Sequence, residues 1–262
     1  LERSITEREL FGSTKPERIA EMEGKTCWLV GEHLIPHLAA AATALVEECK
    51  VKSIQMIVAS EAGVTGMREA IPSHVEQAMT FHIVKNGDIE GTLAEALTAG
   101  GPPTTVVSTP FKELPDVLFG GPGQDRLDTA HFRELVEDNL THHFRIAKRS
   151  VLIDGAQLVL VTPDVEPGSR PGAFALANFF KTSLHAFTAT LAVESERLVH
   201  DTPVNQINLT RRVRSEEPRN ETERAEESKR FARAVILAGA PLPDAEDSRY
   251  RARIYRGMAI TV

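Results

Sequence analysis

Short apolar runs alternate along the chain with longer amphipathic stretches. The runs are rich in Val, Ile and Leu, and most are continuously apolar, which is typical of strands covered on both faces of a sheet. They predict strands at 26–31, 53–60, 79–85, 104–108, 157–162, 203–209 and 257–262.

The longer stretches between these runs predict helices. Pro36 suits the first turn of one helix, Asp128 is a candidate N-cap for another, and Gly100 with Gly101 ends a third. The predicted helices cover 36–50, 92–99, 128–150, 172–197 and 220–239. Alternating strands and helices predict an α/β fold, a Rossmann-like doubly wound parallel sheet of about seven strands with helices on both faces.

The domain boundaries follow from the same pattern. We expect a single domain over 24–262, preceded by a charged linker or extension over 1–23 that arrives from an upstream unit. The stretch 115–123 is rich in Gly and Pro, but we interpret it as a loop between a strand and a helix rather than as an interdomain linker. Residue 1 is Leu and not Met, so we expect a processed chain or a piece of a longer one.

Composition narrows the function classes. The chain has 262 residues, 42% apolar and 26% charged, which is ordinary for a globular domain and excludes a largely disordered one. Its 37 acidic and 30 basic residues give a net charge of −7, which argues against nucleic-acid binding. No run is long enough for a membrane helix, and the N-terminal residues lack the apolar core of a signal peptide. With only two cysteines, Cys27 and Cys49, we expect buried thiols in a cytoplasmic protein.

Several segments resemble the short-chain dehydrogenase/reductase family. Lys181 within a long helix, the segment Leu191-Ala192-Val193-Glu194 that follows it, and Asn139 in the preceding helix match residues of the family's pattern. Val204-Asn205 resembles the start of its sixth strand, and Gly257 precedes what looks like its closing strand. The resemblance covers about 24–262 and implies the family's parallel seven-stranded sheet.

Two further segments, 205–220 and 250–262, resemble the C-terminal end of bifunctional malonyl-CoA reductases. Those bacterial enzymes are built from tandem short-chain dehydrogenase units and use NADPH to reduce malonyl-CoA to malonate semialdehyde and then to 3-hydroxypropionate. The resemblance therefore implies the C-terminal unit of such an oxidoreductase, with a neighbouring catalytic unit of the same polypeptide as its partner and a homodimer of the whole enzyme.

The cofactor-binding turn departs from the family's pattern. The family has three glycines after its first strand, which let the backbone approach a pyrophosphate. Here only Gly31 remains, while Ile35 and His37 stand at the other two glycine positions and Glu32 adds a negative charge. We expect this domain to bind no NADPH, although the whole enzyme would use it.

The catalytic residues depart from the pattern as well. The family's proton-donating Tyr lies four residues before the Lys, and that position is Ala177, whose methyl group cannot transfer a proton. The family's Ser corresponds to the segment 162–164, where Asp164 would repel a developing oxyanion. Asn139 and Lys181 are then remnants with structural roles, and the unit is expected to be non-catalytic.

Two strand ends that line the family's site also differ. Ser108-Thr109-Pro110 replaces its Asn-Ala-Gly, and Leu209-Thr210 replaces its Pro-Gly.

Two other polar segments resemble metal or nucleophile sites only superficially. His142 and His143 are adjacent and diverge around a helix, so we expect them in solvent and without a metal. The segment 168–172 lacks the spacing of a nucleophile turn and is interpreted as a loop.

The helix at 173–194 is apolar nearly all round. One stripe at helical spacing consists of Ala177, Phe180, Leu184, Phe187 and Leu191. One face of the helix must cover the sheet, and the last four residues of this stripe are the predicted contact with a partner unit. The alternative is a core helix capped by a neighbouring loop.

Two alternative functions stay open on the sequence. An autonomous but atypical reductase would place Tyr250 or Tyr255 in the missing Tyr's role. A binding module for acyl-CoA or nucleotide would use Arg211, Arg212 and Arg214, although the acidic residues that follow favour a self-neutralising charged loop.

Overall fold

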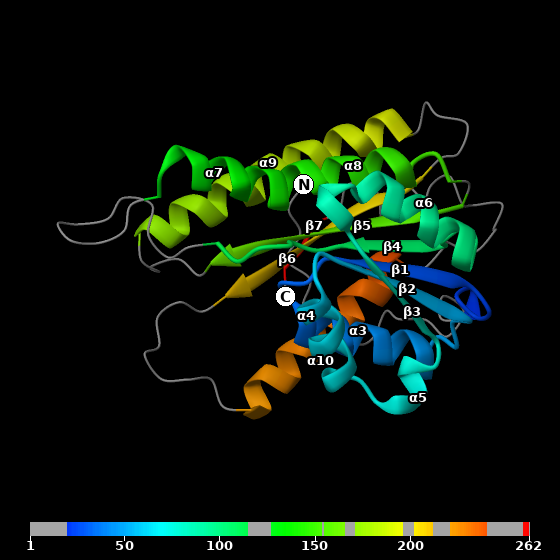
Figure 1. Ribbon diagram of the computed structural model, residues 1–262. Helices are drawn as coiled ribbons and strands as arrows, with labels where there is room; N and C mark the ends of the chain where they lie inside the picture. The colour runs from blue at the N-terminus through cyan, green and yellow to red at the C-terminus, as the bar shows by residue number, and fades with distance from the viewer. Residues whose placement is uncertain are drawn as a thin grey trace.

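The computed structural model contains one seven-stranded sheet in which every pair of neighbouring strands is parallel (Figure 1). The structure describes residues 20–114, 127–153, 155–165, 171–195, 202–211, 221–239 and 259–261. The strand order is β3-β2-β1-β4-β5-β6-β7. The strands are β1 (Thr26–Val30), β2 (Ser53–Val58), β3 (Met79–Ile83), β4 (Thr105–Ser108), β5 (Gln157–Val165), β6 (Val204–Arg211) and β7 (Ala259–Thr261). The predicted fold class and strand number are confirmed.

Helices cover both faces of this sheet (Figure 1). One face carries α3 (Ile35–Glu47), α4 (Glu61–Ala70), α5 (Ser73–Glu76) and α10 (Glu221–Gly239). The other carries α6 (Ile89–Gly100), α7 (Thr129–Val136), α8 (His142–Ser150) and α9 (Pro171–Ser195). Two short helical turns, η1 (Lys85–Gly87) and η2 (Glu137–Thr141), precede α6 and α8. Among the described residues, no helix is long and apolar enough to cross a membrane.

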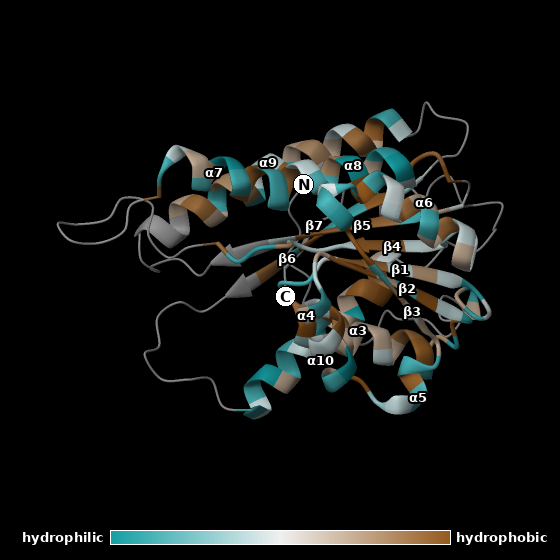
Figure 2. Cartoon of the chain, in the orientation of Figure 1, coloured by the Kyte–Doolittle hydropathy of each residue, from teal (hydrophilic) through white to brown (hydrophobic). Residues whose placement is uncertain are grey.

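The strands form because their residues are apolar on both sides. Along β1, Cys27 and Leu29 belong to the core beneath α3 and α10, whereas Trp28 and Val30 belong to the core beneath α6, α8 and α9. Figure 2 shows the sheet as a largely apolar layer between helices that carry polar residues on their outer surfaces. Cys27 and Cys49 are both buried and unpaired, as predicted.

The predicted helix at 128–150 is interrupted. Asp128 caps its start, accepting a hydrogen bond from the His131 backbone N–H at 2.7 Å. The π-helical turn η2 then separates α7 from α8 and contains Asn139. A single widened turn of this kind spans too few residues to stand out in the sequence pattern.

The sequence also failed to predict α4 and α5. Ser60 caps α4 by accepting a hydrogen bond from the Gly63 N–H at 3.2 Å. Two glycines, Gly63 and Gly66, lie inside this helix and give it a low intrinsic helix propensity. Packing of Val64 and Met67 into the core stabilises it instead.

The C-terminal end of α10 is hydrogen-bonded to the sheet. The Thr105 hydroxyl donates a hydrogen bond to the Gly239 carbonyl oxygen at 2.6 Å, and the Asn205 side-chain amide donates one to the Ala238 carbonyl oxygen at 2.9 Å. Arg233 pairs with Glu48, just beyond the end of α3. The two hydrogen bonds from Thr105 and Asn205 satisfy carbonyl groups that the end of a helix leaves unpaired.

The predicted partner stripe on α9 needs correction. Phe180 and Leu184 are each only 1% exposed and pack inside the domain, so they are not available to a partner unit. Phe187 and Leu191 are partly buried against the same core as Leu184. The reason is that the stripe with the larger side chains faces the sheet and α7. The outer surface of α9 instead carries Phe179 and Val193, which are 43% and 54% exposed.

Candidate functional site

The turn after β1 is fastened to the segment after β4. Gly31 has φ +124, and a Cβ atom built there would lie 2.6 Å from the Thr109 carbonyl oxygen. The Thr109 N–H donates to the Val30 carbonyl at 2.7 Å, and the His33 N–H donates to the Pro110 carbonyl at 3.2 Å. Gly31 is therefore required for close approach of two backbone segments, whether or not a phosphate binds.

The start of α3 offers few donors to a phosphate. Pro36 has no N–H, and the N–H groups of His37 and Leu38 both donate to the Leu34 carbonyl, at 3.0 and 2.9 Å. The N-terminal amides of this helix would otherwise bind the anion. The backbone N–H groups of His33, His37 and Leu38 are therefore already hydrogen-bonded within the protein.

The two side chains that replace the family's glycines lie on the helical layer. The His37 ring packs edge-to-face on Phe231 of α10, with ring centroids 5.5 Å apart, and its Nε2 lies 3.8 Å from Glu227 Oε1. Ile35 packs against the core cluster shared by α3, α4 and α10. At the two positions where the family has glycines, Ile35 and His37 add contacts between α3 and its neighbouring helices.

Glu32 lies between the turn after β1 and the start of α4. Its Oε2 atom accepts hydrogen bonds from the backbone N–H groups of Ala59 and Ser60, each at 2.9 Å. The Ser60 hydroxyl adds a third, at 3.2 Å. The negative charge noted in the sequence is therefore held by donors within the chain.

The position expected for the catalytic Tyr is closed. Ala177 on α9 is 2% exposed, and Lys181, one turn later, is half-buried. Thr162 on β5, in the segment that corresponds to the family's Ser, is buried as well. Tyr250 and Tyr255 lie outside the described residues. The described part of this site therefore offers no tyrosine hydroxyl as a proton donor.

Asn139 has a structural role in the π-helical turn. It is buried, and its side-chain oxygen accepts a hydrogen bond from the Lys112 backbone N–H at 3.3 Å. The Lys112 side chain forms an ion pair with Asp138 at 3.0 Å, and the hydrogen bond between them raises the pKa of Lys112. Residues of η2 thus hold the segment that follows β4.

Ser108 and His143 form a buried pair that the sequence analysis missed. Ser108 Oγ and His143 Nδ1 share a hydrogen bond of 2.6 Å. Burial, with a smaller contribution from His142, lowers the pKa of His143 to about 3, so the ring is neutral at pH 7. Ser108 and His143 are 35 residues apart, so no local sequence pattern marked the pair.

The prediction that His142 and His143 lie in solvent is wrong. Both are buried, and the His142 ring packs against Phe111 with centroids 4.8 Å apart. Burial also lowers the pKa of His142. The described residues contain no cluster of three His, Cys, Asp or Glu side chains able to hold a metal ion.

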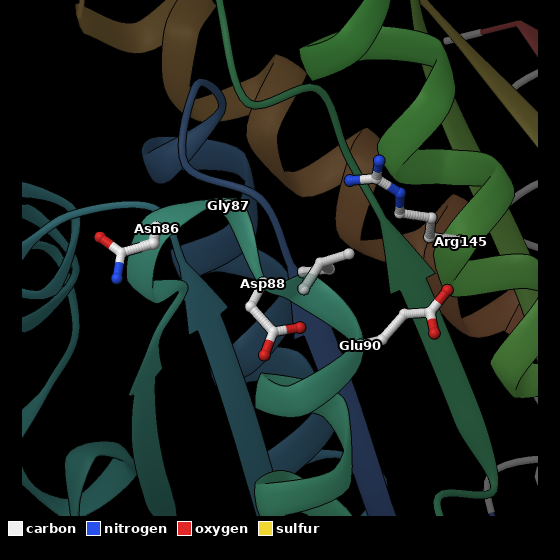
Figure 3. A pocket seen from close by; sticks show the side chains of 6 residues that line it. Asn86, Gly87, Asp88, Glu90 and Arg145 are labelled. Atoms are coloured by element: carbon white, nitrogen blue, oxygen red, sulfur yellow. The ribbon is translucent and has the colours of Figure 1, made fainter.

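A small open pocket of about 270 Å³ lies where β3 and η1 lead into α6. Its lining consists of Asn86, Gly87, Asp88, Ile89, Glu90 and Arg145. Figure 3 shows Asp88 and Glu90 at the start of α6, with Arg145 on α8 across from them. Arg145 already pairs with Glu137 at 2.8 Å, so this pocket holds two carboxylates and no uncommitted cation to attract a phosphate.

The anion contacts predicted after β6 lie largely outside the described residues. Arg212 and Arg214 lie outside the described residues, as does Ser169 in the predicted loop at 168–172. Arg211 is the last residue of β6, and its side chain is not described. The prediction that these arginines contact an acyl-CoA or another anion stays a prediction.

Solved structures that are similar to this chain have the same fold. A scan of protein-family models and a search of curated proteins found no match. Among solved structures, the C-domain of a bacterial malonyl-CoA reductase with NADP is 58% identical with a TM-score of 0.87; the alignment covers 100% of this chain and 39% of that one. The chain thus spans about two fifths of that relative.

Two more distant structures share the fold. A short-chain dehydrogenase/reductase from Serratia marcescens is 14% identical over 92% of this chain and 97% of its own, with a TM-score of 0.65. A dehydrogenase/reductase from Sinorhizobium meliloti is 18% identical over 94% and 96%, with a TM-score of 0.67. The chain has the fold of short-chain dehydrogenase/reductases and, over its whole length, is similar to part of the C-domain of a bacterial malonyl-CoA reductase.

Proposed function

We propose that this chain is a non-catalytic unit within the C-domain of an NADPH-dependent malonyl-CoA reductase. The whole enzyme would reduce malonyl-CoA to malonate semialdehyde and then to 3-hydroxypropionate, in the cytoplasm. The observation that carries the proposal is the buried Ala177 where a short-chain reductase needs its Tyr, in a chain 58% identical to part of such a C-domain. A methyl group neither donates nor accepts the proton that carbonyl reduction requires.

The same proposal assigns NADPH to a neighbouring unit. The relative was crystallised with NADP, but this chain covers only 39% of it. The turn after β1 supports the assignment, because Pro36 lacks an N–H and the amides of His33 and His37 donate to carbonyl groups of the chain itself. A pyrophosphate in the usual pose would find few main-chain donors and only one of the three glycines that it requires.

The retained fold would serve to hold a catalytic unit of the same polypeptide, within a homodimer of the whole enzyme. The outer surface of α8 and α9 supports such a role, since Phe144 is 53% and Val193 is 54% exposed. Large apolar side chains grouped at a surface are typical of sites that another protein surface covers.

The test uses this chain alone and then with the rest of the C-domain added. We expect no saturable NADPH fluorescence change and no malonyl-CoA or malonate semialdehyde reduction by the isolated chain. With the upstream unit added, both appear, and a version lacking this chain is less active or less stable. Turnover by the isolated chain at a rate near that of the full enzyme would contradict the proposal.

A further inference from the structure

The Glu32 carboxylate occupies a position built from main-chain donors. Ala59 and Ser60, which follow β2, each donate a backbone N–H to Oε2 at 2.9 Å. The Ser60 hydroxyl donates to the same carboxylate and accepts from the Gly63 N–H at 3.2 Å. The group is therefore held by two amides and a hydroxyl in one compact arrangement.

A glycine makes room for this carboxylate. A Cβ atom at Gly63 would lie 2.5 Å from Glu32 Oε2 and 3.1 Å from the Val58 Cβ. Any side chain at position 63 would therefore push the carboxylate away from its donors. Gly63, in the first turn of α4, therefore leaves the space that the Glu32 carboxylate occupies.

The location is one that favours anions. In an open parallel sheet, ligands bind beyond the carboxyl ends of the strands, and the Glu32 contact lies beyond the ends of β1 and β2. The start of α4 adds the partial positive charge of a helix N-terminus. A carboxylate of the chain itself supplies the negative charge here.

We propose that Glu32 is the residue that excludes phosphate from this edge of the sheet, because its carboxylate occupies the Ala59 and Ser60 amides. The proposal rests on the proposed function, in which this unit binds no NADPH, and it names the residue responsible at this position. Removal of the carboxylate leaves two main-chain donors and a hydroxyl that a small oxyanion such as inorganic phosphate can fill.

The first test is thermal unfolding of Glu32→Ala in inorganic phosphate, with sodium chloride adjusted to keep the ionic strength constant. Without phosphate we expect a Tm lower by about 3–10 °C, because two main-chain donors and a hydroxyl lose their shared acceptor. Phosphate at millimolar concentrations then recovers at least half of that loss. The wild-type Tm is insensitive to phosphate under the same conditions.

Glu61→Ala is the matched control, because it removes an exposed negative charge from the first turn of α4 without releasing these donors. An equal response to phosphate in Glu32→Ala and Glu61→Ala would overturn the proposal, since a general charge effect would then explain the result. So would a phosphate response in the wild-type protein equal to that of Glu32→Ala.

The second test keeps the proposal falsifiable if Glu32→Ala folds poorly. Glu32→Ser removes the long acceptor but keeps a polar side chain at this half-exposed position, and its backbone amide signals are followed by NMR during a phosphate titration. We expect shifts centred on Ala59 and Ser60, and none there in the wild-type protein. Absence of these shifts in a folded Glu32→Ser overturns the proposal, whereas NADPH turnover by the isolated wild-type chain would instead contradict the proposed function.

Discussion

Gly31 shows how a residue typical of a cofactor site can be retained for another reason. It is the one glycine left of the family's phosphate turn, and its φ of +124 is strained for any residue with a side chain. Its hydrogen atoms face Thr109, so that the strands β1 and β4 meet closely at their ends. Retention of Gly31 therefore does not by itself indicate nucleotide binding.

We predict that Gly31→Ala lowers the free energy of unfolding by about 2–4 kcal/mol, because it adds a steric overlap to an unfavourable φ. Gly24→Ala is the control, since Gly24 has φ +71 but no atom within 4 Å of an added Cβ. Urea denaturation of both variants checks the difference. Equal losses would mean that the contact with Thr109 contributes nothing.

His143 makes stability depend on pH. Its pKa in the folded protein is about 3, below the 6.5 of an ordinary histidine, so between these values the unfolded chain binds more protons. This contribution to the free energy of unfolding is complete above pH 6.5 and falls as the pH drops toward 3, by up to about 1.4 kcal/mol per pH unit.

The measurement is the pH dependence of urea unfolding between pH 7 and 4. His143→Gln keeps an acceptor for Ser108 but cannot titrate, so we expect a shallower decline in stability than in the wild-type protein. His131→Gln serves as control, because His131 is exposed in the first turn of α7. A wild-type slope in His143→Gln would show that the ring is not held neutral.

Restoring the missing Tyr is not expected to restore catalysis. Ala177→Tyr places a ring where Ala177 is 2% exposed, and overpacking of this kind costs about 1–3 kcal/mol. Ala175→Tyr is exposed on the same helix and should cost far less. We expect no NADPH oxidation by either variant, measured at 340 nm, because the turn after β1 offers few phosphate donors and keeps only one of the family's three glycines.

At the scale of elements, the strands were predictable and several connections were not. Most strands are apolar runs, since burial on both faces leaves little choice of residue, although β6 also buries Asn205, Gln206 and Asn208. α4 was missed because its glycines weaken the helical signal. The π turn was missed because it spans only Glu137–Thr141 within one long helical stretch. The Ser108–His143 contact joins residues 35 apart, and such long-range side-chain pairs leave no local pattern in a sequence.

The direction in which α9 faces was also beyond the sequence, because the helix is apolar nearly all round. The structure predicts that Leu184→Ala lowers the free energy of unfolding by about 2–5 kcal/mol, since the side chain is 1% exposed. Val193→Ala, on the outer surface at 54% exposed, should cost less than about 0.5 kcal/mol. Thermal or urea unfolding of the two variants distinguishes the two faces.

At the scale of the whole molecule, the two layers of helices have different surfaces. Phe144 and Val193 are exposed apolar side chains on the outside of the α8–α9 layer, whereas α10 carries charged residues such as Glu226 and Lys229, which pair at 2.9 Å. The proposed neighbouring unit is therefore expected on the α8–α9 side of the sheet.

We predict that Phe144→Glu and Val193→Glu, introduced together, weaken association with the rest of the C-domain at least tenfold and leave the isolated chain folded. Binding measured by calorimetry, with circular dichroism as the folding check, tests this. Lys229→Glu on α10 is the control charge change. Unchanged affinity of the double variant would place the contact elsewhere.

The hydrogen bond between β4 and the end of α10 bears on the order in which the protein folds. Thr105 and Gly239 are 134 residues apart, and their hydrogen bond forms only when β4 is already in the sheet. Closing so long a segment costs conformational entropy before the contact can form. We therefore expect the last turn of α10 to dock in a late step of folding. Thr105→Val should then mainly accelerate unfolding and barely change the refolding rate, as stopped-flow measurements would show.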